Sequence, residues 1–142
     1  MRGPFDRVTI DDCSVGQVAT LVRTISEADV MTFATLTGDY NPVHVDADAA
    51  AASSFGGRIV HGMLTASLLS TVLAMQLPGP GAIYLSQTLR FLRPVRLGDT
   101  VTAQVQVTAI DVATRRMTLA TTIRNERGKM VVEGEASVQL AG

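Results

Sequence analysis

The chain has 142 residues, of which 46% are hydrophobic and 18% are charged, and its mean hydropathy is +0.26. This length and composition are typical of one globular domain with a sizeable core, and they exclude a disordered chain. The formal net charge of −1 argues against nucleic acid or an anionic membrane as the main partner.

The single cysteine bears on the compartment. Cys13 excludes an intramolecular disulfide and a thiolate metal cluster, as expected for a protein of a reducing compartment. Two aspartates precede Cys13 and disfavour its thiolate, so we do not expect it to be a nucleophile. Residues 1–6 lack the apolar run of a signal peptide, and no segment is long enough to span a bilayer. We therefore expect a cytoplasmic protein that does not cross a membrane.

The first predicted elements are a strand and a helix. Residues 18–25 form a short β-prone run that ends at Ser26. Ser26-Glu27-Ala28-Asp29 matches the capping-box pattern, and apolar residues then recur at helical spacing. This predicts a helix that runs to about Leu36 and is ended by Gly38.

The middle of the chain predicts a loop region followed by a long helix. Asp46 or Asp48 can cap a short alanine-rich turn, and residues 53–58 are expected to form a surface loop. The glycine pair in this loop lacks the preceding strand and the spacing of a phosphate-binding motif. Residues 62–77 are apolar or small nearly all the way round, which predicts a helix buried on most sides. Pro78 ends it.

The remainder of the chain changes to the two-residue period of strands. The expected strands cover residues 83–91, 101–108, 117–123 and 130–140, with a hairpin turn at 125–128. Successive hairpins give an antiparallel sheet with one apolar face, and only the helix at 62–77 is apolar enough to cover it. We therefore predict a single α+β domain, 1–142, in which a curved antiparallel sheet wraps around one buried helix.

The stretch from Gly38 to His44, together with the later His61-Gly62-Met63, carries the candidate chemistry. Asp39 and His44 are five positions apart on a loop stiffened by proline, and both could face one cavity beside a helix N-terminus. This pattern indicates an acid/base site. An ordinary turn is the alternative, because aspartate and asparagine before a proline also bond to nearby backbone. Turn chemistry does not require the histidine, however.

The two histidines of the chain raise the question of a metal. His44 and His61 do not have a familiar ligand spacing, so we expect no metal and no other cofactor. We expect His61 to be a structural residue that satisfies a buried hydrogen bond.

With these residues in view, the sequence resembles the MaoC-like, (R)-specific enoyl-CoA hydratases, which have the hot-dog fold. It is most similar to the small single-domain hydratases that supply polyhydroxyalkanoate synthesis. The resemblance covers nearly the whole chain, and the segments that carry it are residues 37–46, 59–64, 77–79, 83–85, 91–95 and 98–99.

The resemblance implies a role for each residue of the motif. Asp39 and His44 would hold and activate the water that adds to a trans-2-enoyl-CoA, and Asn41 would fix the loop or touch substrate. The backbone N–H of Gly62 would receive the thioester oxygen. The chemistry agrees, since addition of water at C3 moves charge onto that oxygen, and a donor at a helix N-terminus stabilises it.

The resemblance also indicates how substrate and partner bind. Ser70 and Met63 of the central helix would line the acyl pocket. A ligand with several phosphates needs local positive charge on a chain of net charge −1. The candidates are Arg58, Arg90, Arg93 and Arg96. We expect a homodimer, because pairing across a two-fold axis would protect the open edge strands of the sheet.

Two other functions are compatible with the predicted fold. One is a hot-dog acyl-CoA thioesterase, which would release free CoA thiol. The other is a catalytically silent acyl-binding subunit of a heterodimeric dehydratase. Such a subunit would be expected to lack the acid/base pair, whereas this chain has both members.

Overall fold

The structure, a computed structural model, describes residues 8–140. Residues 1–6, on which the signal-peptide argument rests, lie outside the described part. The strands are β1 (Val18–Thr24), β2 (Ala82–Gln87), β3 (Arg90–Phe91), β4 (Thr100–Asp111), β5 (Arg116–Asn125) and β6 (Met130–Leu140). The helices are η1 (Ile10–Asp12), α1 (Glu27–Thr37), α2 (Pro42–Val45), α3 (Ala47–Ala51) and α4 (Gly62–Met75).

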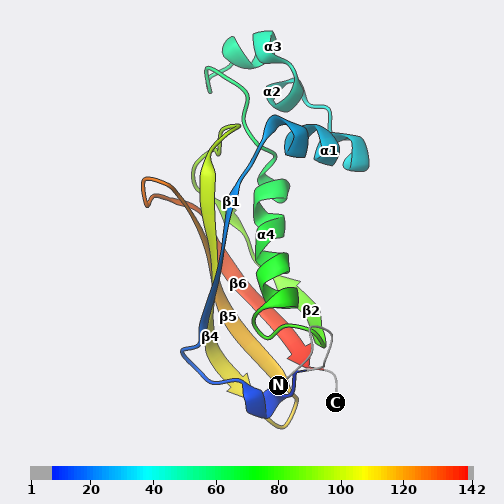
Figure 1. The fold of residues 1–142 in the computed structure, drawn as a ribbon, viewed down its shortest axis with the longest axis vertical. Coiled ribbons are helices and arrows are strands. Elements are labelled where there is room, and N and C mark those ends of the chain that lie inside the picture. The colour runs from blue at the N-terminus through cyan, green and yellow to red at the C-terminus, as the bar shows by residue number, and fades with distance from the viewer. Residues whose placement is uncertain (1–7, 141–142) are drawn as a thin grey trace.

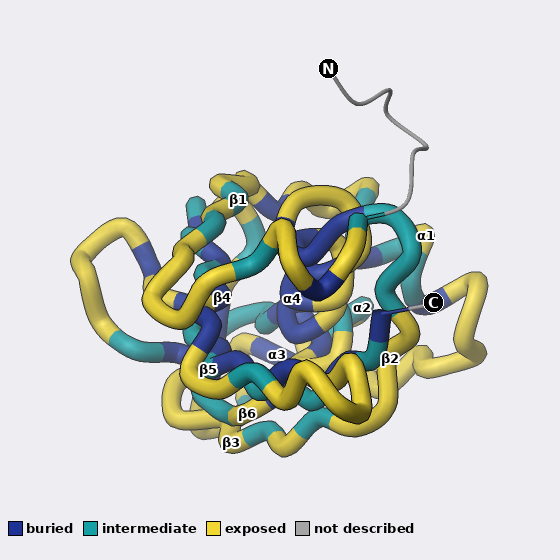
Figure 2. The backbone as a smooth tube through the Cα atoms, turned by 90° about the horizontal axis from the view of Figure 1, so that it is seen from below, coloured by how far each residue is buried: buried dark blue, intermediate teal, exposed yellow. Residues whose placement is uncertain are grey.

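The strands form one antiparallel sheet in the order β1-β4-β5-β6-β2, and β3 also pairs with β6. Figure 1 shows α4 lying along one face of this sheet, with α1, α2 and α3 gathered beyond its N-terminal end. Figure 2 shows the buried residues on α4 and on the strands that surround it. The predicted α+β architecture, a curved antiparallel sheet around a central helix, is confirmed. Among residues 8–140, no helix is long and apolar enough to cross a membrane.

Local capping sets the ends of α1 as predicted. The Asp29 N–H donates to the Ser26 hydroxyl at 3.1 Å, and the Asp29 carboxylate accepts from the Ser26 N–H at 2.9 Å. The hydrogen bond from the Ser26 N–H to the Asp29 carboxylate is the main reason that the pKa of Asp29 is lowered. Gly38 ends the helix with φ +80°, a left-handed conformation that glycine adopts without steric cost. The chain therefore leaves α1 in a fixed direction at Asp39.

The strand expected over 83–91 is interrupted, because β2 ends at Gln87 and β3 begins at Arg90. At the interruption the backbone of Thr88 passes close over β6. A Cβ on Gly134 would lie only 1.8 Å from the Thr88 carbonyl oxygen. Glycine at position 134 allows the backbone of Thr88 to pass this closely. The alternation of apolar and polar residues in the sequence does not indicate such a close approach.

The expectation that the central helix is buried on most sides is wrong for the single chain. Leu69 and Val72 face the sheet and are fully buried, whereas Met63 is 58% exposed and Ser67 and Ser70 are exposed too. The sheet wraps only one side of α4, so the opposite stripe is left open to solvent.

Candidate active site

Hydrogen bonds from side chains to backbone within the Asp39 loop fix its conformation. An Asp39 carboxylate oxygen accepts from the Asn41 N–H at 3.1 Å, and the Asn41 side chain accepts from the Val43 N–H at 3.2 Å. Asn41 is thereby the N-cap of α2, and Pro42 occupies the first helical position. The loop expected from sequence is therefore partly a short helix, and Asn41 fixes it. This helix carries His44.

The His44 ring is oriented by backbone from a later segment. Its Nδ1 lies 2.8 Å from the carbonyl oxygen of Ile59. A carbonyl oxygen can only accept, so Nδ1 carries the hydrogen and donates it. The neutral ring then has its lone pair on Nε2, where it can accept a proton. Arg58 supports the same segment, because its Nε donates to the His44 carbonyl oxygen at 2.7 Å.

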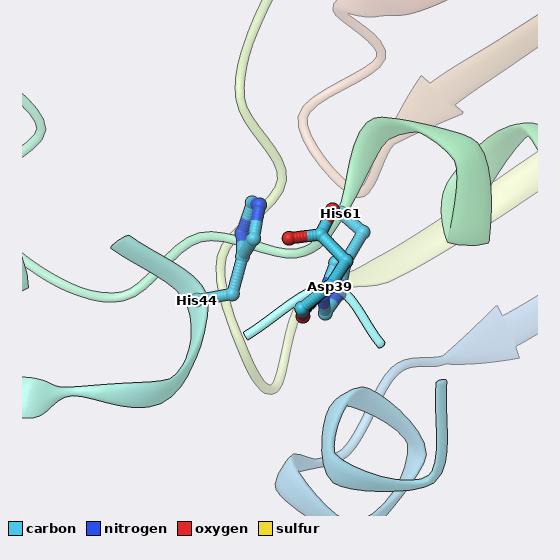
Figure 3. A group of neighbouring side chains, drawn as sticks. All are labelled: Asp39, His44 and His61. Carbon is cyan, nitrogen blue, oxygen red and sulfur yellow. Dashed lines mark hydrogen bonds between the residues drawn. The ribbon is translucent and has the colours of Figure 1, made fainter. Parts of the chain in front are cut away.

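His61 lies next to both Asp39 and His44, as Figure 3 shows. It is 2% exposed, and its ring stacks on the His44 ring with centroids 4.0 Å apart and an interplanar angle of 29°. The other neighbour is Phe33, whose ring centroid is 4.9 Å away. His61 Nε2 lies 3.0 Å from the backbone oxygen of Asp39 and donates to it. The expected structural hydrogen bond is confirmed.

The spacing of the pair suits a shared water molecule. One side-chain donor or acceptor atom of each of Asp39, His44 and His61 lies within 4.8 Å of the others. In Figure 3 the Asp39 carboxylate points toward the His44 ring. Two hydrogen bonds of about 2.8 Å span such a gap, so one water can bond to the carboxylate and to the imidazole at once.

The same three residues are poorly arranged for a metal ion. A ring nitrogen binds a metal through a lone pair in the plane of its ring. The His44 and His61 rings are stacked at 29°, so their planes are closer to parallel than to convergent. Lone pairs in two such planes do not meet at one ion. The geometry therefore favours proton transfer over metal binding.

A cavity of about 450 Å³ opens beside His44. Its wall includes His44, Gly62 and Thr65, together with Phe91 and Arg93 from the chain around β3. Gly62 is the first residue of α4, and its N–H has no acceptor among residues 8–140. A Cβ on Gly62 would lie 2.9 Å from the Phe91 ring, so the backbone itself forms this part of the wall. The volume is typical of a small-molecule site.

The cavity brings together some of the predicted residues and leaves out others. His44, Gly62 and Arg93 line it. Asp39 and Asn41 are exposed and are not among its lining residues, so of the predicted acid/base pair only His44 forms part of its wall. Met63 and Ser70 lie on the exposed stripe of α4. Sequence reasoning missed Thr65 and the aromatic ring of Phe91. The signal at Thr65 was a hydroxyl residue one turn after His61, the first of four in a helix that is otherwise apolar or glycine.

The four candidate arginines differ in what they contact. Arg58 is engaged within the chain, since it also donates to Glu27 at 3.2 Å and its side chain is only 15% exposed. Arg90 pairs with Glu133 at 3.1 Å on the surface. The remaining two bond to backbone carbonyls and are exposed: Arg93 to Met130 at 2.7 Å and Arg96 to Phe55 at 2.6 Å.

Comparison with known families adds to this geometry. The family model described as MaoC like domain matches residues 14–129. The chain belongs to the MaoC-like family. An (R)-specific enoyl-CoA hydratase of Rhodospirillum rubrum is 50% identical over 130 residues, covering 92% of this chain and 90% of the relative.

Solved structures of two (R)-hydratases agree with the fold described above. The (R)-hydratase of Aeromonas caviae involved in PHA biosynthesis has a TM-score of 0.88 and 48% identity, over 91% of this chain and 98% of that one. The R-hydratase PhaJ1 of Pseudomonas aeruginosa has a TM-score of 0.90 and 45% identity, over 94% and 86%. The predicted hot-dog fold is confirmed.

Proposed function

We propose that this chain is an (R)-specific enoyl-CoA hydratase that adds water reversibly to trans-2-enoyl-CoA. The observation that carries the proposal is the pairing of Asp39 with His44 beside the free N–H of Gly62, in a MaoC-like chain about half identical to hydratases of this specificity. The (R) configuration of the product is taken from those relatives.

Asp39 and His44 activate the water. The water donates one hydrogen bond to the Asp39 carboxylate and the other to His44 Nε2. The carboxylate and a nitrogen of the His44 ring lie within 4.8 Å of each other. As the water oxygen bonds to C3, one of its protons passes to the pair. C2 then receives a proton from the same pair, so the net reaction adds one water across the double bond. Coupled groups share these transfers, and we assign neither residue to a single step.

Gly62 stabilises the charge that develops. While the water oxygen adds to C3, electron density moves through C2 to the thioester oxygen, which becomes enolate-like. The Gly62 N–H at the N-terminus of α4 donates to that oxygen, and the bond strengthens in the transition state. Phe91, packed against Gly62, keeps water away from one side of this contact.

A hydration assay tests the proposed function. Purified protein with crotonyl-CoA should remove the enoyl-thioester absorbance and form (R)-3-hydroxybutyryl-CoA. A series of chain lengths on CoA and on acyl-carrier protein then defines the substrate. Release of free thiol with no hydroxyacyl product would instead assign a thioesterase, and activity that appears only with a second chain would assign a silent subunit.

We infer further that the chain forms a homodimer through the edge formed by β2 and β3. Large apolar side chains of this edge are exposed in the single chain: Ile83, Tyr84, Leu85, Phe91 and Leu92. The exposed stripe of α4 begins at Met63, next to Gly62, which Phe91 contacts. Exposed strand edges are usually paired or protected, and a two-fold axis at this edge would cover it.

Light scattering checks the dimer. At micromolar concentration we expect a mass twice the 15.0 kDa of one chain. Ile83→Lys places a charge on the proposed interface and should yield monomers. Val22→Lys is the matched control, since Val22 is 61% exposed on β1 at the opposite edge of the sheet. A monomeric wild type, or dissociation by the control alone, would contradict the interface.

We also propose that exposed arginines bind the phosphates of CoA, with Arg93 the first candidate because it lines the cavity. Arg90 and Arg96 are further candidates. Arg58 is assigned instead to supporting the His44 segment. Arg93→Ala should raise KM for crotonyl-CoA several-fold with little change in kcat, since a charge-assisted phosphate contact contributes to ground-state and transition-state binding alike. An unchanged KM in single alanine variants of Arg90, Arg93 and Arg96 would remove this proposal.

A further inference from the structure

His61 contacts both Asp39 and His44. Its Nε2 donates to the Asp39 backbone oxygen, and its ring stacks on the His44 ring. We propose that His61 is a positioning residue that sets the distance between these two groups, and that the hydroxyl of Thr65 fixes the His61 tautomer. The inference rests on the proposed function, in which Asp39 and His44 share one water.

Two unpaired polar atoms carry the second part of the proposal. Among residues 8–140, the only buried side-chain nitrogen or oxygen atoms without a hydrogen-bond partner are His61 Nδ1 and Thr65 Oγ1. The two residues are 2% and 1% exposed. They stand four positions apart at the start of α4, a spacing that places side chains on one face. Buried polar groups left unpaired are rare and call for an explanation.

The two unpaired atoms are complementary. Because Nε2 donates its hydrogen to the Asp39 backbone oxygen, neutral His61 has a lone pair on Nδ1. The two atoms are not hydrogen-bonded to each other, so one buried water would join them, accepting from the Thr65 hydroxyl and donating to the lone pair on Nδ1. Such a bond holds the hydrogen on Nε2, where it is needed for Asp39. Thr65, His61 and Asp39 then form a chain of hydrogen bonds that ends at the catalytic loop.

A packing role alone does not account for an imidazole at position 61. The ring lies between Phe33 and His44, and a phenylalanine would fill the same space. Phenylalanine would also avoid burying Nδ1, which costs free energy when it is unpaired. What phenylalanine cannot supply is the N–H for the Asp39 backbone. The identity of residue 61 is therefore explained by that hydrogen bond.

Two substitutions separate the hydrogen bond from the ring. His61→Phe keeps an aromatic ring against His44 and loses the donor, and we expect kcat to fall about 10- to 100-fold with KM little changed, because the loop that carries Asp39 is misplaced. His61→Gln keeps an amide N–H near the position of Nε2 and should recover most of the lost kcat. Thermal unfolding of both variants controls for folding. Wild-type kcat in a folded His61→Phe protein would overturn the proposal, as would a Gln variant no better than Phe.

Nitrogen NMR of the rings tests the tautomers without reference to activity. The chain has only two histidines, so two ring systems are observed. We expect His44 with its hydrogen on Nδ1 and His61 with its hydrogen on Nε2. Thr65→Val, which removes the hydroxyl and keeps the shape, should shift the His61 Nδ1 resonance, whereas Thr65→Ser should not. A His61 hydrogen on Nδ1, or no response to Thr65→Val, would overturn the proposal even if hydration proceeds through Asp39 and His44.

Discussion

Replacing Asp39 by asparagine, or His44 by asparagine, is expected to lower kcat for hydration about 10²- to 10⁴-fold, the range for loss of a positioned acid or base. Both substitutions preserve local structure. In Asp39→Asn the amide oxygen can still accept from the Asn41 N–H, and in His44→Asn the amide N–H can donate to the Ile59 carbonyl in place of Nδ1. KM should therefore change little. Steady-state kinetics on crotonyl-CoA, with thermal unfolding as the folding control, measures the effect.

The double variant adds a sharper test of joint action. If Asp39 and His44 hold one water, the second substitution should cost little beyond the worse single one, because groups that act as a unit are not additive. Asp46→Asn is the matched control, since Asp46 only caps α3 and asparagine caps equally well. If either single variant retained nearly full activity, Asp39 and His44 would be assigned to stabilising an ordinary turn and not to catalysis.

The second large effect is expected at Gly62. Gly62→Pro removes the N–H proposed to bind the thioester oxygen, and loss of one such donor costs about 10²- to 10³-fold in kcat. Proline suits the site in other respects. Gly62 is the first residue of α4, where proline is favoured, and the preceding His61 has ψ 129°, outside the α region that a following proline disfavours.

Gly62→Ala is the control for this experiment. Alanine adds the same Cβ against the Phe91 ring, 2.9 Å away, yet keeps the N–H. The ring can shift, so we expect a modest loss in the alanine variant and a much larger loss in the proline variant. The ratio of the two kcat values removes the effect of the shared Cβ and reports the replacement of the N–H by the proline ring. Equal activities in the two folded variants would show that Gly62 does not stabilise the transition state through its N–H.

The parts of the fold that follow short-range rules could be predicted from sequence. The capping box at Ser26 and the Gly38 stop fix α1, and the hairpin turn before β6 forms as expected, with the Gly128 N–H bonded to the Asn125 carbonyl at 2.9 Å. The interruption between β2 and β3 could not be foreseen. It depends on how closely Thr88 approaches Gly134, and these two residues meet only in the folded sheet.

The candidate site likewise has one part that could be predicted from sequence and another that could not. Asp39, His44 and Gly62 stand in one recognisable motif, so their proximity could be predicted. The support behind them could not, because the Ile59 carbonyl that orients His44 is 15 positions away and belongs to backbone that any residue could supply. The stacking of His61 on His44 likewise depends on where α4 begins in space. Neither the composition of the chain nor the spacing of its apolar residues indicates such contacts.

A crystal structure of the Asp39→Asn variant with crotonyl-CoA bound tests the central claim most directly. The substitution should slow hydration enough for the enoyl thioester to persist. We predict that the thioester oxygen lies about 3 Å from the Gly62 nitrogen, within hydrogen-bond distance, and that one water lies between residue 39, His44 Nε2 and C3 of the substrate. A thioester oxygen directed away from Gly62, or a C3 out of reach of that water, would contradict the account.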